Sequence, residues 1–167
     1  MSKLTPMEVE LVEDAPSTLP AAGRSMGQQQ TLFIRQEFAD LEKVGLVKPA
    51  KTPVYASPAF VVKKKGPKKW RMVIDMRELN KWTKKTALQM PNLEEQLSRL
   101  GNARYFVSFD VFSGFDYLST SERSQKYFNI VTLEACVTML GAPMGWTNTP
   151  QIYQNRIVEE ILKPAEI

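Results

Sequence analysis

The feature that most constrains the fold is a run of prolines at 49, 53 and 58, which excludes a helix there and imposes an extended path. The segments that follow, 59–62 and 70–75, are rich in strand-forming residues, and Gly66-Pro67 lies in the turn between them. Alternate side chains of a strand point to opposite faces. The second strand is therefore predicted to put Trp70 and its apolar neighbours on one face and Arg71 on the other.

Helical patterns appear before and after this hairpin. The predicted helices cover 28–44, ended by the C′ glycine Gly45; 92–101; and a segment that begins near 148 and stops at Pro164. Two of them begin with a capping-box pattern, Asn92 with Glu95 and Asn148 with Gln151.

Further strands are predicted in the second half of the chain. Residues 105–109 form a nearly continuous apolar run, as in a strand covered on both faces, and deliver Asp110 at its end. Residues 127–131 and 135–140 are predicted to pair. Residues 1–24 lack periodicity and are expected to form an extended lead-in. Helices and strands follow one another without a strict βα rhythm, which favours an α+β fold.

Composition excludes several kinds of chemistry. The chain has no histidine and one cysteine, Cys136, so an internal disulfide, a cysteine-built zinc site and a histidine base are excluded. Catalysis would have to use carboxylates, lysines or a metal held by oxygen ligands. No apolar run could span a bilayer, and the first residues do not form a secretory signal, so a cytosolic or particle-interior location is expected.

Charge is distributed unevenly. Residues 43–85 contain 13 lysines and arginines and two acids, a net +11, whereas the whole chain carries +4. Such a block can bind polyphosphate by counterion release. A solvated basic face is the alternative reading of the charge alone.

Three patches then resemble one known family. Residues 55–65 with 70–81 look like the fingers hairpin of retroviral and gypsy-type LTR-retrotransposon reverse transcriptases. Residues 102–115 resemble the palm strand that bears the first catalytic aspartate. Residues 142–154 are similar to the loop and helix start beneath the incoming nucleotide. The three patches occur in the order and spacing of the family.

The resemblance implies a right-hand polymerase fold with an incomplete ferredoxin-like palm. After the lead-in, the fingers would comprise 25–84 and 119–145, and the partial palm 85–118 and 146–167. The family's Tyr-x-Asp-Asp hairpin follows the last helix, and no Asp-Asp pair occurs in this sequence. The chain is therefore expected to stop before that hairpin and to lack polymerase activity alone.

The resemblance also implies the site. The complete enzyme would be an RNA-directed DNA polymerase that adds dNTPs to a primer 3′-OH by two-metal phosphoryl transfer. Asp110 would be catalytic and, with the Val111 carbonyl, would bind Mg²⁺. Met144 replaces the glutamine or aromatic residue that is usual there. The implied nucleotide-binding residues are Lys64, Arg71, Ser113, Gly114, Phe115 and Met144, and the implied template-binding residues are Arg77, Gly145 and Pro150.

Other interpretations remain open for the residues and for the chain. Taken singly, Asp110 is a turn or cap residue, Lys64 and Arg71 are surface charges, and Phe115 is a core aromatic. The implied partners are an RNA or DNA template–primer, dNTPs and the rest of a polymerase polyprotein. The alternatives are a non-catalytic nucleic-acid-binding remnant of a retroelement and a decayed copy without function.

Overall fold

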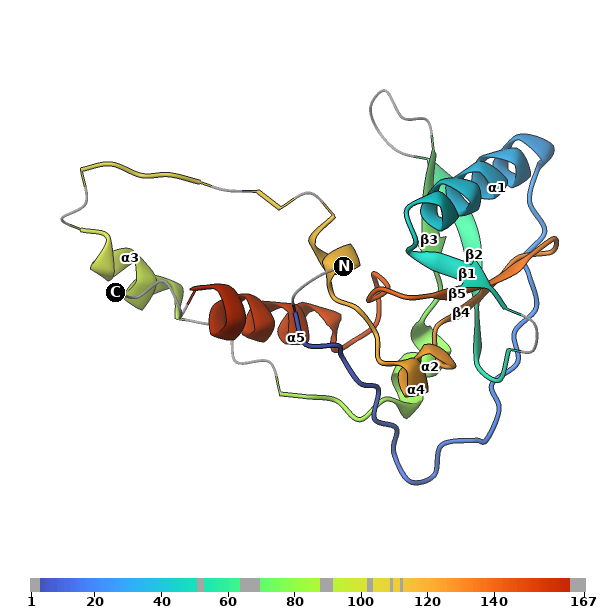
Figure 1. The fold of residues 1–167 in the computed structure, drawn as a ribbon, viewed down its shortest axis with the longest axis horizontal. Coiled ribbons are helices and arrows are strands. Elements are labelled where there is room, and N and C mark those ends of the chain that lie inside the picture. The colour runs from blue at the N-terminus through green and yellow to red at the C-terminus, as the bar shows by residue number, and fades with distance from the viewer. Residues whose placement is uncertain are drawn as a thin grey trace.

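A mixed five-stranded sheet forms the centre of the protein (Figure 1). The computed structural model describes residues 4–50, 53–63, 70–87, 92–101, 104–108, 110–111 and 113–162. The strands, in the spatial order β1-β5-β4-β2-β3, are β1 (Val47–Pro49), β5 (Cys136–Met139), β4 (Asn129–Val131), β2 (Ala56–Lys63) and β3 (Trp70–Ile74). The pair β2–β4 is parallel and the other pairs are antiparallel. The expected mixture of helices and strands without a strict βα rhythm is confirmed.

Strand β2 joins the two halves of the sheet. Its first three residues pair with β4, whereas Ala59 to Lys63 pair with β3 as the predicted hairpin. Arg71 lies opposite Val62 and is exposed, whereas its neighbours on β3 are partly buried. The predicted orientation of Arg71 is therefore confirmed.

Helix α1 (Gln28–Lys43) covers β1, β2 and β3 (Figure 1). It buries Ile34 and Phe38, which lie one turn apart on the same face. Gly45 follows the helix with φ +74°, in the left-handed region where glycine is favoured. The predicted helix and its C′ glycine are both confirmed.

The segment before α1 packs against the protein as an extended strand-like chain. Bridges pair Met7 with Thr120, Leu11 with Thr83 and Leu19 with Tyr55. The Met7 side chain is only 1% exposed and belongs to the same apolar cluster as the sheet and α1. The extended backbone predicted for this segment is present, but the segment also contributes to the core.

The remaining helices are short. They are α2 (Arg77–Trp82), α3 (Leu93–Arg99), the 3₁₀ helix η1 (Gly114–Tyr117), α4 (Glu122–Gln125), α5 (Thr149–Arg156) and its π-helical continuation η2 (Ile157–Leu162). The Asn92 side chain accepts a hydrogen bond from Glu94 N–H, which confirms Asn92 as the cap of α3. In the described ranges, no helix combines the length and the apolarity that a bilayer crossing requires.

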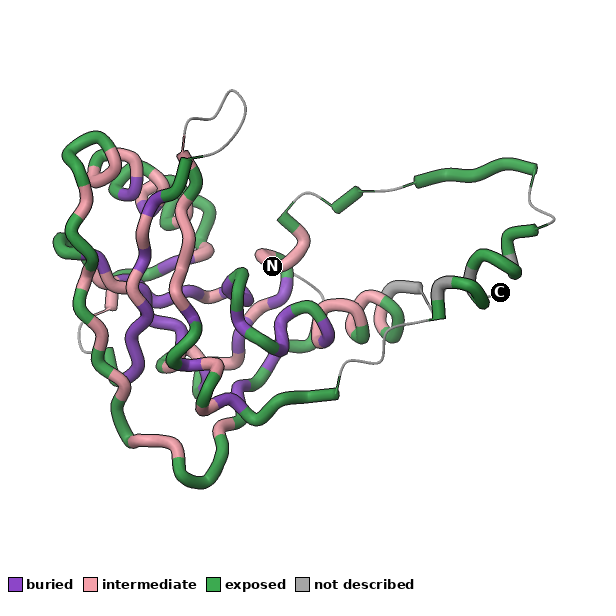
Figure 2. Tube along the Cα trace, turned by 180° about the vertical axis from the view of Figure 1, so that it is seen from behind, coloured by how far each residue is buried: buried purple, intermediate pink, exposed green. Residues whose placement is uncertain are grey.

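The strand predicted over 105–109 is wrong for the residues that the structure describes there. Residues 104–108 have no strand assignment, and Tyr105, Phe106 and Val107 are 91%, 68% and 77% exposed (Figure 2). A strand needs a partner for its backbone N–H and C=O groups. No described strand of this chain pairs with the segment, which projects from the sheet together with α3 (Figure 1).

The capping box predicted at Asn148 is also wrong, although helix α5 itself is present. Asn148 makes no side-chain cap. Its amide instead donates to Lys84 C=O (2.9 Å) and accepts from Thr86 N–H (3.3 Å). The Gln151 side chain donates to Ala87 C=O. Both side chains are therefore used to fasten the start of α5 to the chain after α2.

Candidate nucleotide and template site

The clearest juxtaposition in the predicted site joins β3 to the loop between β5 and α5. The Nη2 atom of Arg71 lies 2.7 Å from the Met144 sulfur, to which it donates. Both side chains are exposed, and the thioether is a weak, polarisable acceptor. Two predicted nucleotide-binding residues far apart in sequence are thus in contact at the surface.

The loop that carries Met144 is held by α2. The Asn80 amide donates to Gly145 C=O (2.9 Å) and accepts from Thr147 N–H (3.0 Å). The indole of Trp146 is 1% exposed and donates to the Thr83 hydroxyl at 3.0 Å. Gly145 has φ +99°, a conformation that favours glycine. Trp146 thus packs in the core beneath this loop, and Asn80 and Thr83 are contributors that the sequence analysis missed.

The turn after Asp110 packs on helix α5. A Cβ on Gly114 would lie 2.4 Å from the Tyr153 hydroxyl oxygen, so only glycine fits there without movement. The Phe115 and Tyr153 rings meet edge to face, with centroids 5.2 Å apart. Ser113 precedes the turn with φ +50°, and burial raises the pKa of the nearby Asp116 carboxyl. Ser113, Gly114 and Phe115 are therefore placed beside α5.

Arg77, a predicted template-binding residue, is fixed by Asp75. Its Nε and Nη2 atoms donate to the two carboxylate oxygens at 2.8 and 2.7 Å. Arg24 from the lead-in binds the same carboxylate. Hydrogen bonds from Arg77, together with the charge of both arginines, lower the pKa of Asp75 to about 2.

The other predicted site residues take no part in the contacts described above. Asp110 and Val111 are exposed, and neither side chain forms a hydrogen bond or ion pair with another described residue. Pro150 is exposed near the start of α5. Lys64 lies outside the described residues. The catalytic role of Asp110 and the nucleotide-binding role of Lys64 stay predictions.

A two-magnesium site needs several oxygen ligands, which the described residues do not assemble. Among them, no group of three or more Asp, Glu, Cys or His side chains is close enough to hold a metal ion. One exposed carboxylate, Asp110, and the neighbouring carbonyl do not amount to such a cage. The donor set in the described part of this chain therefore does not fit the complete metal site that the family implies.

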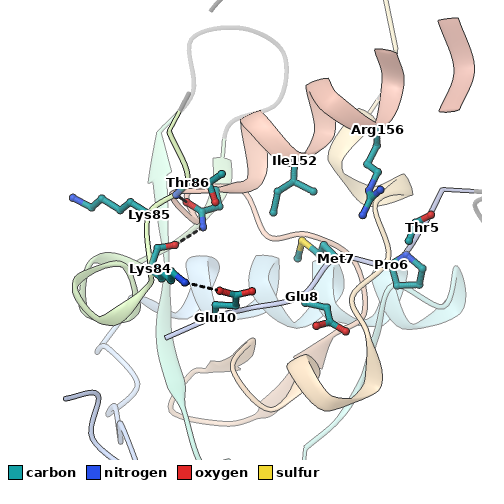
Figure 3. Close-up of a pocket in the computed structure, with 11 residues that line it drawn as sticks. Thr5, Pro6, Met7, Glu8, Glu10, Lys84, Lys85, Thr86, Ile152 and Arg156 are labelled. Carbon is teal, nitrogen blue, oxygen red and sulfur yellow. Dashed lines mark hydrogen bonds and ion pairs between the residues drawn. The ribbon is translucent and has the colours of Figure 1, made fainter. Parts of the chain in front are cut away.

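A separate cavity of about 580 Å³ opens between the lead-in, the chain after α2 and helix α5 (Figure 3). Met7 and Ile152 line it on opposite sides, and Arg156 points toward it from α5. Lys84 and Glu10 form an ion pair of 3.3 Å at its edge. None of the residues predicted for the site lines this cavity.

Comparison with known proteins gives the relationship. Residues 62–166 match the family described as "Reverse transcriptase (RNA-dependent DNA polymerase)". The chain is 33% identical over 134 residues to the "Retrovirus-related Pol polyprotein from transposon opus" of Drosophila melanogaster, which covers 78% of this chain and 13% of the relative. It is 34% identical over 141 residues to the corresponding polyprotein from transposon gypsy of the same organism. This alignment also covers 78% of this chain and 13% of the relative.

A third relative is a plant virus protein. The "Putative enzymatic polyprotein" of Cassava vein mosaic virus is 35% identical over 113 residues, which is 66% of this chain and 17% of that protein. The chain thus spans about one eighth to one sixth of the length of these curated relatives. The matched family covers more than half of the chain, and together these findings show that the chain belongs to the reverse transcriptase (RNA-dependent DNA polymerase) family of LTR retroelements.

Proposed function

We propose that this chain is the fingers and first part of the palm of a retroelement reverse transcriptase, and that it supplies the nucleotide and template contacts of that enzyme. In this proposal the fingers comprise 25–84 and 119–145, and the partial palm comprises 85–118 and 146–167. The template–primer, dNTPs and the remainder of a polymerase polyprotein are its partners, in the cytoplasm or in virus-like particles.

The observation that carries the proposal is the convergence of the three family-like patches. Arg71 of the first patch contacts Met144 of the third, and Phe115 of the second contacts Tyr153 of the third. Patches that merely happened to resemble the family would have no reason to meet. The first contact joins β3 to the loop before α5, and the second joins η1 to α5, as expected if the three patches contribute to one site.

Each side chain then has a proposed role. Arg71, with Lys64, grips the triphosphate of the incoming nucleotide, because guanidinium and ammonium groups stabilise phosphoryl oxygens. The backbone at Ser113 and Gly114 adds N–H donors. Phe115 excludes a ribose 2′-OH, and Met144 packs against the sugar or base. The proposed template contacts are made by Arg77, Gly145 and Pro150.

Asp110 is proposed as the catalytic carboxylate, and the Val111 carbonyl as its neighbour in binding Mg²⁺ in the complete enzyme. Divalent metal supplies charge neutralisation to phosphoryl transfer in this family. Among the described residues, no group of three or more metal-binding side chains comes together. The 167 residues by themselves are therefore proposed to be inactive.

Primer extension on an RNA template tests both parts of this proposal. A polymerase region that includes this chain and the polyprotein after it should lose extension by about a thousandfold or more when Asp110 is replaced by alanine. Replacement of the exposed Asp14 by alanine is the matched control and should have no effect. The 167 residues alone should give no Asp110-dependent extension with dNTPs and Mg²⁺ or Mn²⁺. Extension that survives Asp110→Ala would overturn the catalytic assignment.

A non-catalytic nucleic-acid-binding remnant is the second candidate. It is favoured by the basic block over 43–85 and by the exposure of Asp110, which no described residue engages. The affinity for a labelled oligonucleotide should then fall steeply with rising salt concentration and weaken on charge reversal at Lys63–Lys69. It should not change in Asp110→Ala. Salt-independent binding would exclude this candidate.

A further inference from the structure

Asp75 is a nearly buried carboxylate shared by two arginines. Its side chain is 11% exposed, and it accepts from Arg77 Nε, Nη2 and backbone N–H. Arg24 Nη2 binds Oδ2 of the same carboxylate, the oxygen that also accepts from Arg77 Nη2. The group of Arg24, Asp75 and Arg77, here called the Asp75 cluster, therefore carries one net positive charge.

The two arginines are held to different extents. The Arg77 side chain is 79% exposed and has no other described ion-pair partner than Asp75. Arg24 is less exposed and also stacks on the Phe60 ring, with its guanidinium carbon 4.5 Å from the ring centroid. Loss of the carboxylate would thus leave Arg24 with a second contact and would leave Arg77 without one.

The residues on either side of Asp75 border the loop that carries Met144 and Gly145. Asp75 lies between Ile74 and Met76 in the chain, and both of these face Gly145. A Cβ on Gly145 would be 3.7 Å from Ile74 C=O and 3.9 Å from Met76 Cγ. The backbone that carries Asp75 therefore lies against Gly145, another residue of the proposed template surface.

We propose that Asp75 is a positioning residue, whose carboxylate holds the Arg77 guanidinium in one orientation so that it can bind a template phosphate. The inference rests on the proposed template role of Arg77. The pair with Asp75 uses two of the five N–H donors of the guanidinium, so others remain for a phosphate. An arginine held in place before binding loses less rotamer freedom when the phosphate arrives.

The direction in which Asp75→Asn changes the affinity for nucleic acid separates positioning from general electrostatic attraction. Asp75→Asn adds one positive charge, and general attraction to phosphate would make binding tighter. Loss of positioning instead predicts binding weaker by about three- to tenfold. Glu78→Gln is the matched control, because Glu78 also neutralises a neighbouring cation, Lys81, in an exposed pair of 2.7 Å. This control should bind as tightly as the unchanged chain or more tightly.

The measurement is fluorescence anisotropy of a labelled RNA template annealed to a DNA primer, with the 167-residue chain. Asp75→Asn should weaken binding in the parent and have little further effect in an Arg77→Ala background. Binding by Asp75→Asn as tight as that by Glu78→Gln would overturn the proposal. So would an equal weakening in the Arg77→Ala background, because a purely structural role of Asp75 would not depend on Arg77.

A second readout does not depend on nucleic acid. The Arg77 Nε–H should give a distinct, exchange-protected ¹H–¹⁵N signal that disappears in Asp75→Asn but persists in Glu78→Gln. If the unchanged chain does not bind the labelled template–primer, the proposed function is contradicted. The Arg77 Nε–H signal still tests, independently of binding, whether Asp75 holds Arg77. An Arg77 Nε–H already averaged with solvent in the unchanged chain would overturn the positioning role.

Discussion

At the residue scale, Gly114 and Tyr153 show how closely the proposed nucleotide pocket is packed against α5. A Cβ on Gly114 would lie 2.4 Å from the Tyr153 hydroxyl oxygen and 2.8 Å from the ring carbon that bears it. The same ring meets Phe115 edge to face, so it cannot move without disturbing that contact. The absence of a side chain at position 114 therefore leaves room for the Tyr153 ring, against which Phe115 packs.

Gly114→Ala is expected to lower the free energy of unfolding by about 1–3 kcal/mol, because the added methyl group overpacks this contact. Urea denaturation checks the value. Gly101→Ala is the matched control: its nearest contact, Ser98 C=O, would be 3.4 Å away, so little change is expected. Shortening the opposing side chain with Tyr153→Leu should reduce the cost of Gly114→Ala. An equal cost of Gly114→Ala in the unchanged chain and in the Tyr153→Leu variant would show that the two positions do not interact.

At the element scale, the segment before α1 is part of the fold. Residues 4–24 form isolated bridges with the residue before β2, the residue after α2 and the turn before α4, and they bury Met7 against the main core. Gly23 lies so close to the Thr132 backbone that a Cβ would be 2.2 Å from its carbonyl carbon. The segment is thus fitted to the strands of the sheet, although the matched family begins only at residue 62.

Met7→Ala should destabilise the protein by about 2–4 kcal/mol, since it removes a fully buried side chain and leaves a cavity. Val12→Ala is the matched control in the same segment, because Val12 is 39% exposed, and its cost should be below about 0.5 kcal/mol. Thermal or urea unfolding of the two variants measures the difference. Similar stabilities would mean that the segment is not packed as described.

Elements with local signals were predictable, whereas those that depend on distant partners were not. Helix α1 with Gly45, and the hairpin that exposes Arg71, follow from periodicity and turn chemistry within a few residues. Asn148 has the sequence of a helix cap, yet its amide is used by Lys84 and Thr86, more than sixty residues away. Asn80 gave no local sign that it would hold Gly145. The nucleotide-binding roles proposed for Arg71 and Met144 rest on family resemblance, and only the structure shows that the two side chains are in contact.

At the scale of the whole molecule, the sheet and α1 enclose the core, whereas 104–108 and α3 project from it (Figure 2). Leu97 of α3, Leu100 just after it and the apolar side chains of 105–107 are exposed to solvent. The segment from 105 to 108 also has strand-forming residues without a described strand partner. Exposed apolar segments of this kind pair with one another or with another chain.

We therefore expect the 167-residue chain to self-associate at micromolar concentrations, and Phe106→Lys to weaken that association by about tenfold or more. A charge at the centre of the apolar run opposes strand pairing and burial between copies. Sedimentation velocity over a range of concentrations measures the effect. Leu133→Lys is the matched control, because Leu133 is 66% exposed, much as Phe106 is at 68%, but lies in the turn between β4 and β5. A chain that stays monomeric, or an equal effect of both lysines, would show that 105–108 is not the surface through which copies of the chain associate.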